Sequence, residues 1–225
     1  MDIQPGADET ATTSTTQRVA IVLRQLLITG EINPGERLKV ESLKARLNVG
    51  ASPIREALSL LTSDQLVERI DQRGFRAAPI SEANFSEILT LRCKLEAMAL
   101  RSSIERGQTH WEEQLVLSHH RLAQAERSNI KEWEIQHKAY HRSLIDACDS
   151  PILLRFCDQL YDLNIRYRYL ALKSKIYKKR NVSDEHQRIM EAAVARDADT
   201  ASRLLEEHYR STGDYLAGQM AAFAE

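Results

Sequence analysis

The stretch INPGERLKVESLKARLNVGASPIREALSLLTSDQLVERIDQRGFRA, residues 32–77, decides the fold of the first third of the chain. Within it, residues 40–47 place leucines on one side and basic residues on the other, which predicts a short helix. The letters NVG at 48–50 predict a tight break. A second helix is then expected, with Ser52 as its N-cap and Pro53 at its first position.

Elements on both sides of this pair of helices complete the arrangement. Apolar residues recur every three or four positions from about Thr15 and stop near Gly30, which predicts a preceding helix. Residues 66–80 alternate apolar and polar side chains around Arg73 and Gly74, which predicts two short strands joined by a turn. Together these elements predict a winged helix-turn-helix domain, whose second motif helix lies in the major groove of DNA.

Basic residues gather in this segment, although the whole chain is nearly neutral. Its formal net charge is −1, which argues against a protein that coats nucleic acid along its whole length, whereas residues 37–55 hold five basic residues against Glu41. Spacing alone predicts DNA contacts at Lys39, Lys44, Arg46, Ser52, Arg55 and Arg73. The alternative is a plain three-helix domain whose basic face is only solvated.

The same stretch resembles the DNA-binding domain of GntR-type bacterial transcription regulators. The combination of PGERL, PIREAL and RGF carries the resemblance, which covers roughly residues 15–80. It implies that Arg55 and the residue two before Pro53, which is Ala51, meet the operator. It also implies that Gly74 lets the backbone approach DNA.

The chain departs from this family pattern in two places. It has GAS at 50–52 where the family usually has Ser-Arg-Thr, and Glu41 where an arginine is often found. Two expected arginine contacts are therefore missing. Because each bidentate arginine–guanine contact is worth ~1–3 kcal/mol of discrimination between bases, the operator sequence does not follow from the chain.

The rest of the chain is predicted to be helical. After PISEA at 79–83 there is no Gly before Gly107 and no Pro before Pro151. Helices are expected at about 82–106, 110–127, 130–147, 151–173, 182–196 and 198–221, forming an antiparallel bundle. The predicted fold is thus mainly α: a disordered leader at 1–14, a winged helix-turn-helix domain at 15–80 and an all-α domain at 81–225.

Composition bears on the compartment. Cys93, Cys148 and Cys157 are odd in number and lack CxxC spacing, which predicts reduced thiols. No apolar run approaches the ~18 residues of a membrane span, and the leader lacks the basic and apolar regions of a signal peptide. A cytoplasmic protein without a membrane partner is expected.

Histidines provide the candidate chemistry of the helical domain. Four of the seven fall on the inward faces of three predicted helices, namely His137, His141, His186 and His208. Packed in an apolar core, they would leave several donors and acceptors to satisfy. Neutral imidazole also suits Zn, Ni, Cu or Fe. From the residues alone, hydrogen-bonded packing and metal binding both stay open, as do an internal Arg92–Glu96 ion pair and a ligand role for Arg92.

Residues 82–220 resemble the FCD ligand-binding domain of the FadR subfamily of these regulators. LRCKLEAMAL (91–100), HKAYH (137–141), EHQRIMEAAVARD (185–197) and ASRLLEEH (201–208) carry the resemblance. It implies a divalent metal held by an acid or amide one turn before a histidine and by two later histidines. Those histidines are His141, His186 and His208, while His137 stands in the place of the acid.

An all-histidine set raises the charge of the site by one, which favours an anionic effector and shifts the expected metal from manganese toward zinc or nickel. Whether His137 binds the ion stays open. The resemblance makes Arg92 the clamp for a carboxylate. The predicted effector site comprises Arg92, Glu96, Tyr140, Arg166 and Arg168.

The sequence therefore predicts a transcription regulator that binds a two-fold operator as a homodimer. The resemblance implies repression as the output, since the residues themselves do not show its sign. A small organic acid beside the metal would control it. In one alternative the metal is purely structural and the bundle only dimerises. In another, which the sequence disfavours, the protein is a metal-dependent hydrolase. Only Glu96 could act as a general base, and GxSxG, P-loop and GxGxxG motifs are absent.

Overall fold

The computed structural model describes residues 14–71, 73–173 and 182–220. The chain divides into two compact units, the first ending at Pro79 and the second beginning at Ile80. The predicted leader lies outside the described residues, apart from Ser14.

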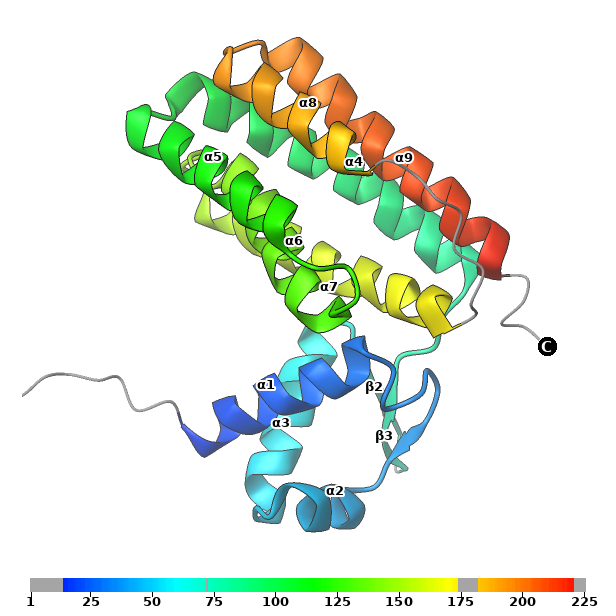
Figure 1. Ribbon diagram of the computed structural model, residues 1–225. Coiled ribbons are helices and arrows are strands. Elements are labelled where there is room, and N and C mark those ends of the chain that lie inside the picture. The colour runs from blue at the N-terminus through cyan, green and yellow to red at the C-terminus, as the bar shows by residue number, and fades with distance from the viewer. Residues whose placement is uncertain (1–13, 72, 174–181, 221–225) are drawn as a thin grey trace, which may run out of the picture. The chain divides into compact units, whose positions relative to one another are not determined.

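The first unit is a winged helix-turn-helix domain, as predicted (Figure 1). Its helices are α1 (Thr15–Ile28), α2 (Val40–Leu47) and α3 (Ala51–Ser63), and its strands are β1 (Arg37–Leu38), β2 (Val67–Ile70) and β3 (Gly74–Ala77). The antiparallel sheet has the order β1-β3-β2. Helix α1 packs along α3, and their shared core includes the fully buried Leu23, Ile54, Leu58 and Leu61.

The start of α3 differs from the prediction. Gly50, not Ser52, is the N-cap, no side chain caps the helix, and Pro53 is its third residue. Ser52 Oγ instead donates to Glu56 Oε1 at 3.2 Å within the same helix. Proline is tolerated there because the first amides of a helix have no intrahelical partner. The turn from α2 passes through Asn48, whose φ of 50° is left-handed.

Strand β1 was also not predicted. It consists of two residues of PGERL, and Arg37 and Leu38 pair with Arg76 and Phe75 of β3. Two residues are too few to produce an alternating pattern, so this strand could not be recognised by periodicity.

The second unit is an all-α bundle, and its helices begin and end within a few residues of the predicted positions. They are α4 (Glu82–Arg106), α5 (Thr109–Gln124), α6 (Ile130–Ile145), α7 (Pro151–Lys173), α8 (Val182–Val194) and α9 (Ala198–Met220). Helix α4 runs along α9 and also packs on α6 and α7, while α5 lies against α6 and α8 (Figure 1).

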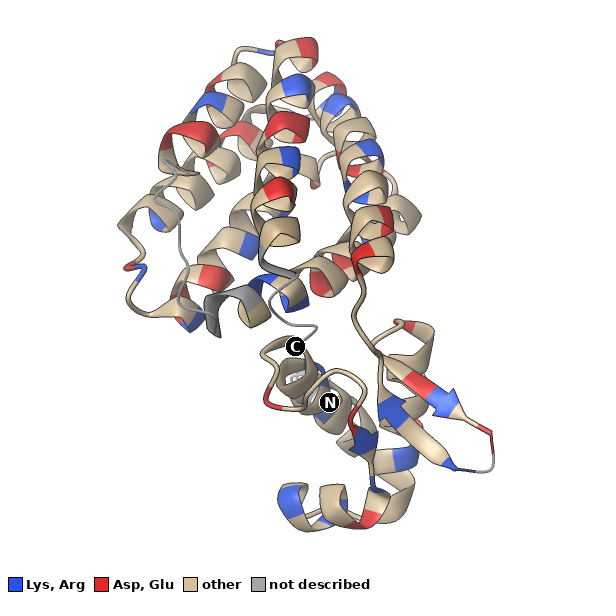
Figure 2. Cartoon of the chain, turned by 90° about the vertical axis from the view of Figure 1, so that its right-hand side faces the viewer, with Lys and Arg blue, Asp and Glu red and all other residues tan. Residues whose placement is uncertain are grey.

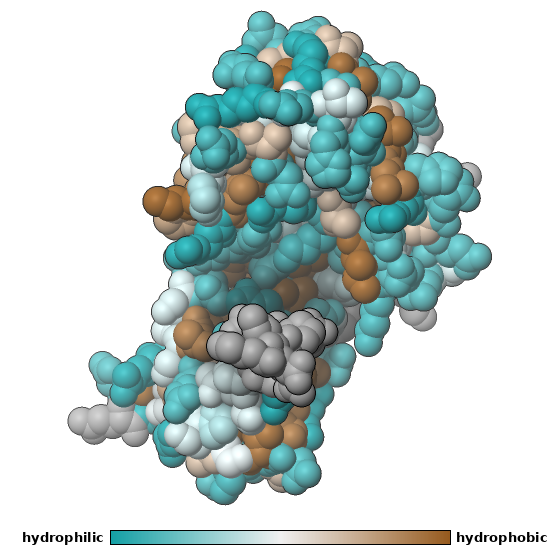
Figure 3. All heavy atoms as spheres, turned by 90° about the vertical axis from the view of Figure 1, so that its left-hand side faces the viewer, coloured by the Kyte–Doolittle hydropathy of each residue, from teal (hydrophilic) through white to brown (hydrophobic). Residues whose placement is uncertain are grey.

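The helices of the second unit approach closely around a large apolar core. Leu100, Leu115, Leu144 and Ile189 are fully buried in it. At Gly213 on α9, an added Cβ would collide with the side chain of Leu89 on α4. The outer face drawn in Figure 3 is largely hydrophilic, with apolar residues in small groups. Among the described helices, none has the length and apolar character needed to cross a membrane.

Candidate metal centre and nucleic-acid interface

The predicted DNA contacts lie on the surface of the first unit, with different electrostatic surroundings. In the described part of the chain, Lys39, Arg55 and Arg73 are exposed and have no carboxylate partner. Lys44 Nζ lies 2.7 Å from Glu41 Oε2, and Arg46 Nη2 lies 3.2 Å from Glu31 Oε2. Figure 2 shows the basic residues on α2 and on the strands. Two of the predicted cations are therefore already neutralised within the protein.

The remaining predicted contacts are not charged. Ala51 and Pro53 are half-buried in the first turn of α3, and the Ser52 hydroxyl is already bonded to Glu56. Gly74 is exposed at the start of β3 with a φ of +90°, a conformation that glycine adopts readily and other residues rarely do. A side chain at this position would strain the backbone of the wing.

The four inward histidines converge in the second unit. His137 and His141 lie one turn apart on α6, His186 comes from α8, and His208 from α9. One ring nitrogen of each lies within 4.8 Å of those of the others, and all four side chains are buried. Burial is the largest cause that lowers the pKa of His137, His141 and His186 well below the usual range, which favours the neutral, metal-binding form of imidazole.

Hydrogen bonds at Nδ1 orient three of the rings. His137 Nδ1 lies 2.8 Å from the hydroxyl of Tyr161, and His141 Nδ1 lies 2.9 Å from that of Tyr209. His208 Nδ1 lies 2.8 Å from Glu185 Oε2. A bond from Nδ1–H leaves Nε2 as the nitrogen with the lone pair, as a metal ligand requires.

The Nε2 atoms themselves meet the requirements of a cation site. His137 and His141 bring their Nε2 atoms to 3.1 Å from each other. Around a zinc ion, four nitrogens at usual bond lengths are about 3.3 Å apart. Furthermore, His186 Nε2 is buried without a hydrogen-bond partner among the described residues. Two facing lone pairs and one unsatisfied nitrogen are unfavourable in a dry core, whereas a bound cation would satisfy all three, so the residues fit a metal ion.

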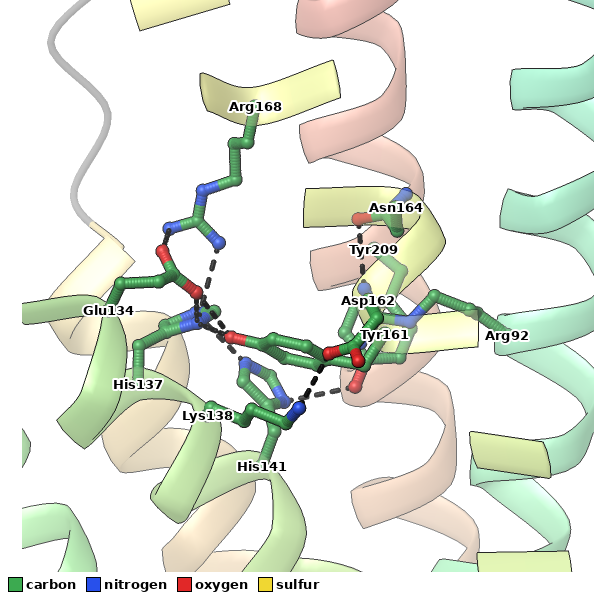
Figure 4. A network of polar contacts seen from close by, with 10 residues as sticks. All are labelled: Arg92, Glu134, His137, Lys138, His141, Tyr161, Asp162, Asn164, Arg168 and Tyr209. Atoms are coloured by element: carbon green, nitrogen blue, oxygen red, sulfur yellow. Dashed lines mark hydrogen bonds and ion pairs between the residues drawn. The ribbon is translucent and has the colours of Figure 1, made fainter. Parts of the chain in front are cut away.

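Two ion pairs flank the histidines, one buried and one partly exposed, and Figure 4 draws Arg92 beside Asn164 and Arg168 beside Glu134. Arg92 Nε donates to Glu96 Oε1 at 2.7 Å, and Arg92 Nη1 donates to Asn164 Oδ1 at 2.9 Å. The other pair joins Arg168 Nη2 to Glu134 Oε2 at 3.4 Å. The internal Arg92–Glu96 pair considered from the sequence is thus present. Even so, Arg92 Nη2 is buried and unpaired within the described part of the chain, so a ligand role also remains available to it.

Two residues of the predicted effector site take other positions. Tyr140 packs beside the histidines, but its hydroxyl donates to the backbone oxygen of His186 at 2.7 Å and therefore supports α8. Arg166 is buried on α7. It precedes Arg168 by two residues, so the two side chains point about 200° apart around the helix. Arg166 thus leaves α7 in another direction than Arg168, whose Nη1 lies 3.4 Å from His137 Nδ1.

Four residues of the site were missed by the sequence analysis. Three of them contact a histidine of the cluster directly, namely Tyr161, Tyr209 and Glu185. The fourth, Glu134, is linked to His137 through the hydroxyl of Tyr161. Local signals existed for three of them. Glu185 and Tyr209 adjoin His186 and His208 in the sequence, and Glu134 precedes His137 by one turn. Tyr161 had no such signal.

A small cleft leads to the cluster between α5, α6 and α8. Its volume is about 60 Å³, and it is lined by His119, Leu122, Ala123, Ala125, Arg127, Trp133, Ser183 and His186. Because a water molecule needs about 10–15 Å³ by this measure, the cleft has room for roughly four to six heavy atoms. Trp133 stacks on His137 at 4.6 Å between ring centroids, and the guanidinium of Arg168 lies 4.9 Å from the same indole.

Comparisons with known proteins cover both units. The family described as "Bacterial regulatory proteins, gntR family" matches residues 15–76, and the FCD domain matches residues 87–211. The Escherichia coli HTH-type transcriptional repressor GlaR is 33% identical over 83% of this chain and 88% of its own length. BphR of Paraburkholderia xenovorans, an HTH-type transcriptional regulator, is 36% identical over 84% of this chain and 80% of its own.

Solved structures show the same fold. Escherichia coli McbR superposes with a TM-score of 0.80 at 22% identity, covering 92% of this chain and 99% of McbR. A GntR-type regulator from Rhodococcus superposes with a TM-score of 0.73 at 22% identity, over 92% of this chain and 99% of that protein.

Proposed function

The chain belongs to the GntR family of bacterial regulatory proteins, and from that premise we propose that it is a metal-dependent, effector-controlled repressor. It is a transcription regulator and not an enzyme, so the hydrolase alternative is set aside. In the proposal, two winged helix-turn-helix heads of a homodimer bind a two-fold operator, and a small organic acid in the helical domain controls that binding.

The convergence of four buried histidines carries the proposal. His137, His141, His186 and His208 would hold one divalent ion through Nε2. Nitrogen-only ligands favour zinc or nickel over manganese, which prefers oxygen. When bound, the ion supplies a positive centre to which a carboxylate oxygen can bind.

The charges around the cluster support an anionic effector. Neutral imidazoles leave both charges of a divalent ion uncompensated. Glu96 and Glu134 are already paired with Arg92 and Arg168, and Glu185 contributes one carboxylate through its contact with His208. A positive excess therefore remains in a low-dielectric core, where it attracts an anion strongly.

The unpaired donor and the cleft support a small carboxylate as the class of effector. Arg92 Nη2 is a buried N–H group that a carboxylate oxygen would satisfy. The cleft of about 60 Å³ beside His186 suits only a few heavy atoms unless side chains move. The names of GlaR and of the gluconate operon repressor of Bacillus subtilis, which is 24% identical, favour repression as the output.

The metal part of the proposal is tested by elemental analysis and thermal melting of the full-length protein. We expect about one ion per chain, lost in His186→Ala and retained in His120→Ala, whose histidine is exposed on α5. At free zinc 100 times its Kd, binding raises the free energy of unfolding by about 2.7 kcal/mol. For a chain of this size that is roughly 5–11 °C in Tm.

The effector part is tested by DNA binding with and without small carboxylates, in metal-loaded and chelator-treated protein. Release of DNA only in the metal-loaded form supports the proposal. If the wild-type protein is folded without bound metal and its response to acids is unchanged, the metal centre is contradicted. The conclusion that the protein binds DNA would still stand.

A further inference from the structure

Two hydrogen-bonded chains with the same chemical order surround the histidine pair of α6 (Figure 4). One runs from His137 through the hydroxyl of Tyr161 to Glu134, which is paired with Arg168. The other runs from His141 to Tyr209, both drawn in Figure 4, and on to Glu96, which lies outside that view and is paired with Arg92. In each, a tyrosine hydroxyl stands between an imidazole Nδ1 and a carboxylate that an arginine holds.

The order of groups determines where the protons lie. An ionised carboxylate only accepts hydrogen bonds, so the single hydroxyl proton of Tyr209 goes to Glu96, and that of Tyr161 goes to Glu134. Each hydroxyl oxygen must then accept from the neighbouring Nδ1–H. Arg168 Nη1 also lies near His137 Nδ1, but at 3.4 Å against 2.8 Å for Tyr161, and the shorter contact decides the assignment.

Burial protects this arrangement from exchange with solvent. Tyr161 is 6% exposed and Tyr209 is 4% exposed, so water does not compete for their hydroxyl groups. A neutral imidazole carries one N–H, and the group bonded at one nitrogen determines which tautomer is present. With Nδ1–H donated to tyrosine, the lone pairs of both histidines are at Nε2, and these atoms lie 3.1 Å apart.

We propose that Tyr161 and Tyr209 are positioning residues of the metal centre, each holding its histidine as the Nδ1–H tautomer with Nε2 directed at one common point. This inference rests on the proposed metal binding, because the tautomer matters only if Nε2 is a ligand. It makes His137 a ligand of the same kind as His141, because in both rings Nδ1 bonds to a tyrosine and Nε2 stays available. Loss of a group that orients a metal ligand lowers metal affinity by about 10–100-fold.

The experiment compares three tyrosine-to-phenylalanine variants of the full-length protein. Tyr161→Phe and Tyr209→Phe each remove one hydroxyl that faces a histidine. Tyr167→Phe is the matched control, because Tyr167 is buried on the same helix as Tyr161 and its hydroxyl donates to Asn84 Oδ1 at 2.7 Å. Co²⁺ is titrated by visible absorption, and zinc affinity is measured in competition with a chelating dye.

We expect Tyr161→Phe and Tyr209→Phe to bind each ion about 10–100-fold more weakly, with an altered Co²⁺ spectrum. Tyr167→Phe should melt at a lower temperature and keep the affinity and spectrum of the wild type. If the two test variants bind as tightly as Tyr167→Phe, the positioning role is wrong while the metal centre stands. If wild-type protein binds no Co²⁺ or zinc, both proposals are overturned.

A second measurement does not depend on the variants folding. In metal-stripped wild-type protein, ¹⁵N chemical shifts distinguish a protonated ring nitrogen from one with a lone pair. We expect His137 and His141 to be Nδ1–H tautomers. An Nε2–H tautomer at either ring would overturn the assignment for that histidine.

Discussion

Removal of one carboxylate should strengthen DNA binding by the first unit. Glu41 lies in the first turn of α2 and neutralises Lys44, with 2.7 Å between Oε2 and Nζ. Its side chain is 79% exposed, so it also repels any phosphate that approaches Lys44. Glu41→Gln keeps the size and polarity of the side chain and removes its charge. Lys44 then becomes available to a phosphate.

Counterion release sets the expected magnitude. Each phosphate neutralised by a basic residue contributes about −0.9 to the slope of log K against log salt. Lys39, Arg55 and Arg73, counted on two heads, give about six contacts and a slope near −5. A released Lys44 on each head adds about two contacts, which steepens the slope to about −7. Between 50 and 200 mM salt, the loss of affinity grows from about 10³-fold to about 10⁴-fold.

Fluorescence anisotropy on labelled duplex DNA over a salt series measures this slope, and a non-operator duplex suffices because the effect does not depend on sequence. Glu207→Gln is the matched control. Glu207 is an exposed carboxylate on α9, with its Oε1 2.8 Å from Arg203 Nη1, so its replacement changes the net charge by the same amount but outside the DNA-binding unit. An unchanged slope in Glu41→Gln, or one equal to that of Glu207→Gln, would refute the reasoning.

Three further predictions address DNA binding, packing and pH. Arg55→Ala should abolish operator protection in footprinting while the circular dichroism spectrum stays unchanged. Normal protection would contradict the placement of Arg55 in the major groove of DNA. Gly107→Ala should lower the free energy of unfolding by about 1–3 kcal/mol in urea, because its Cβ would meet Trp111 at 2.5 Å, whereas Gly218→Ala has nothing within 4 Å and should show no loss. Burial lowers the pKa of His137, His141 and His186 below the usual 6.5. Metal-stripped protein should therefore lose stability as the pH falls below 6.5, where the unfolded chain binds protons that the folded chain does not. Equal stability at pH 7 and pH 5.5 would contradict this.

The helices could be predicted because their ends carry local signals. Ser81 caps α4 through a bond to the amide of Asn84, and Pro151 begins α7. Such signals act within a few residues, so no knowledge of the tertiary structure is needed. The start of α3 was misplaced because Ser52 is a good capping residue by type, but it lies inside the helix, where its hydroxyl donates to Glu56 and accepts no bond from a capping amide.

The site could be predicted only in part, because its outer members depend on which helices face each other. The histidines were found because each lies on an apolar stripe of its own helix. Tyr161 on α7 has no distinctive sequence context, and Glu134 on α6 is marked only by its position one turn before His137. Arg166 and Arg168 are equally plausible from NIRYRYL, and only the packing of α7 selects Arg168 as the one that reaches His137.

The left-handed turn at Asn48 has a consequence for how the protein tolerates mutation. Its side chain is exposed, so by contacts alone almost any residue should be accepted. Its backbone, at φ 50° and ψ 50°, suits glycine and asparagine, while other residues lose about 1–2 kcal/mol there. In a saturation library, position 48 should therefore tolerate few substitutions, β-branched residues least of all. The direction of α3 relative to α2 thus depends on the backbone conformation of Asn48 and not on contacts of its side chain.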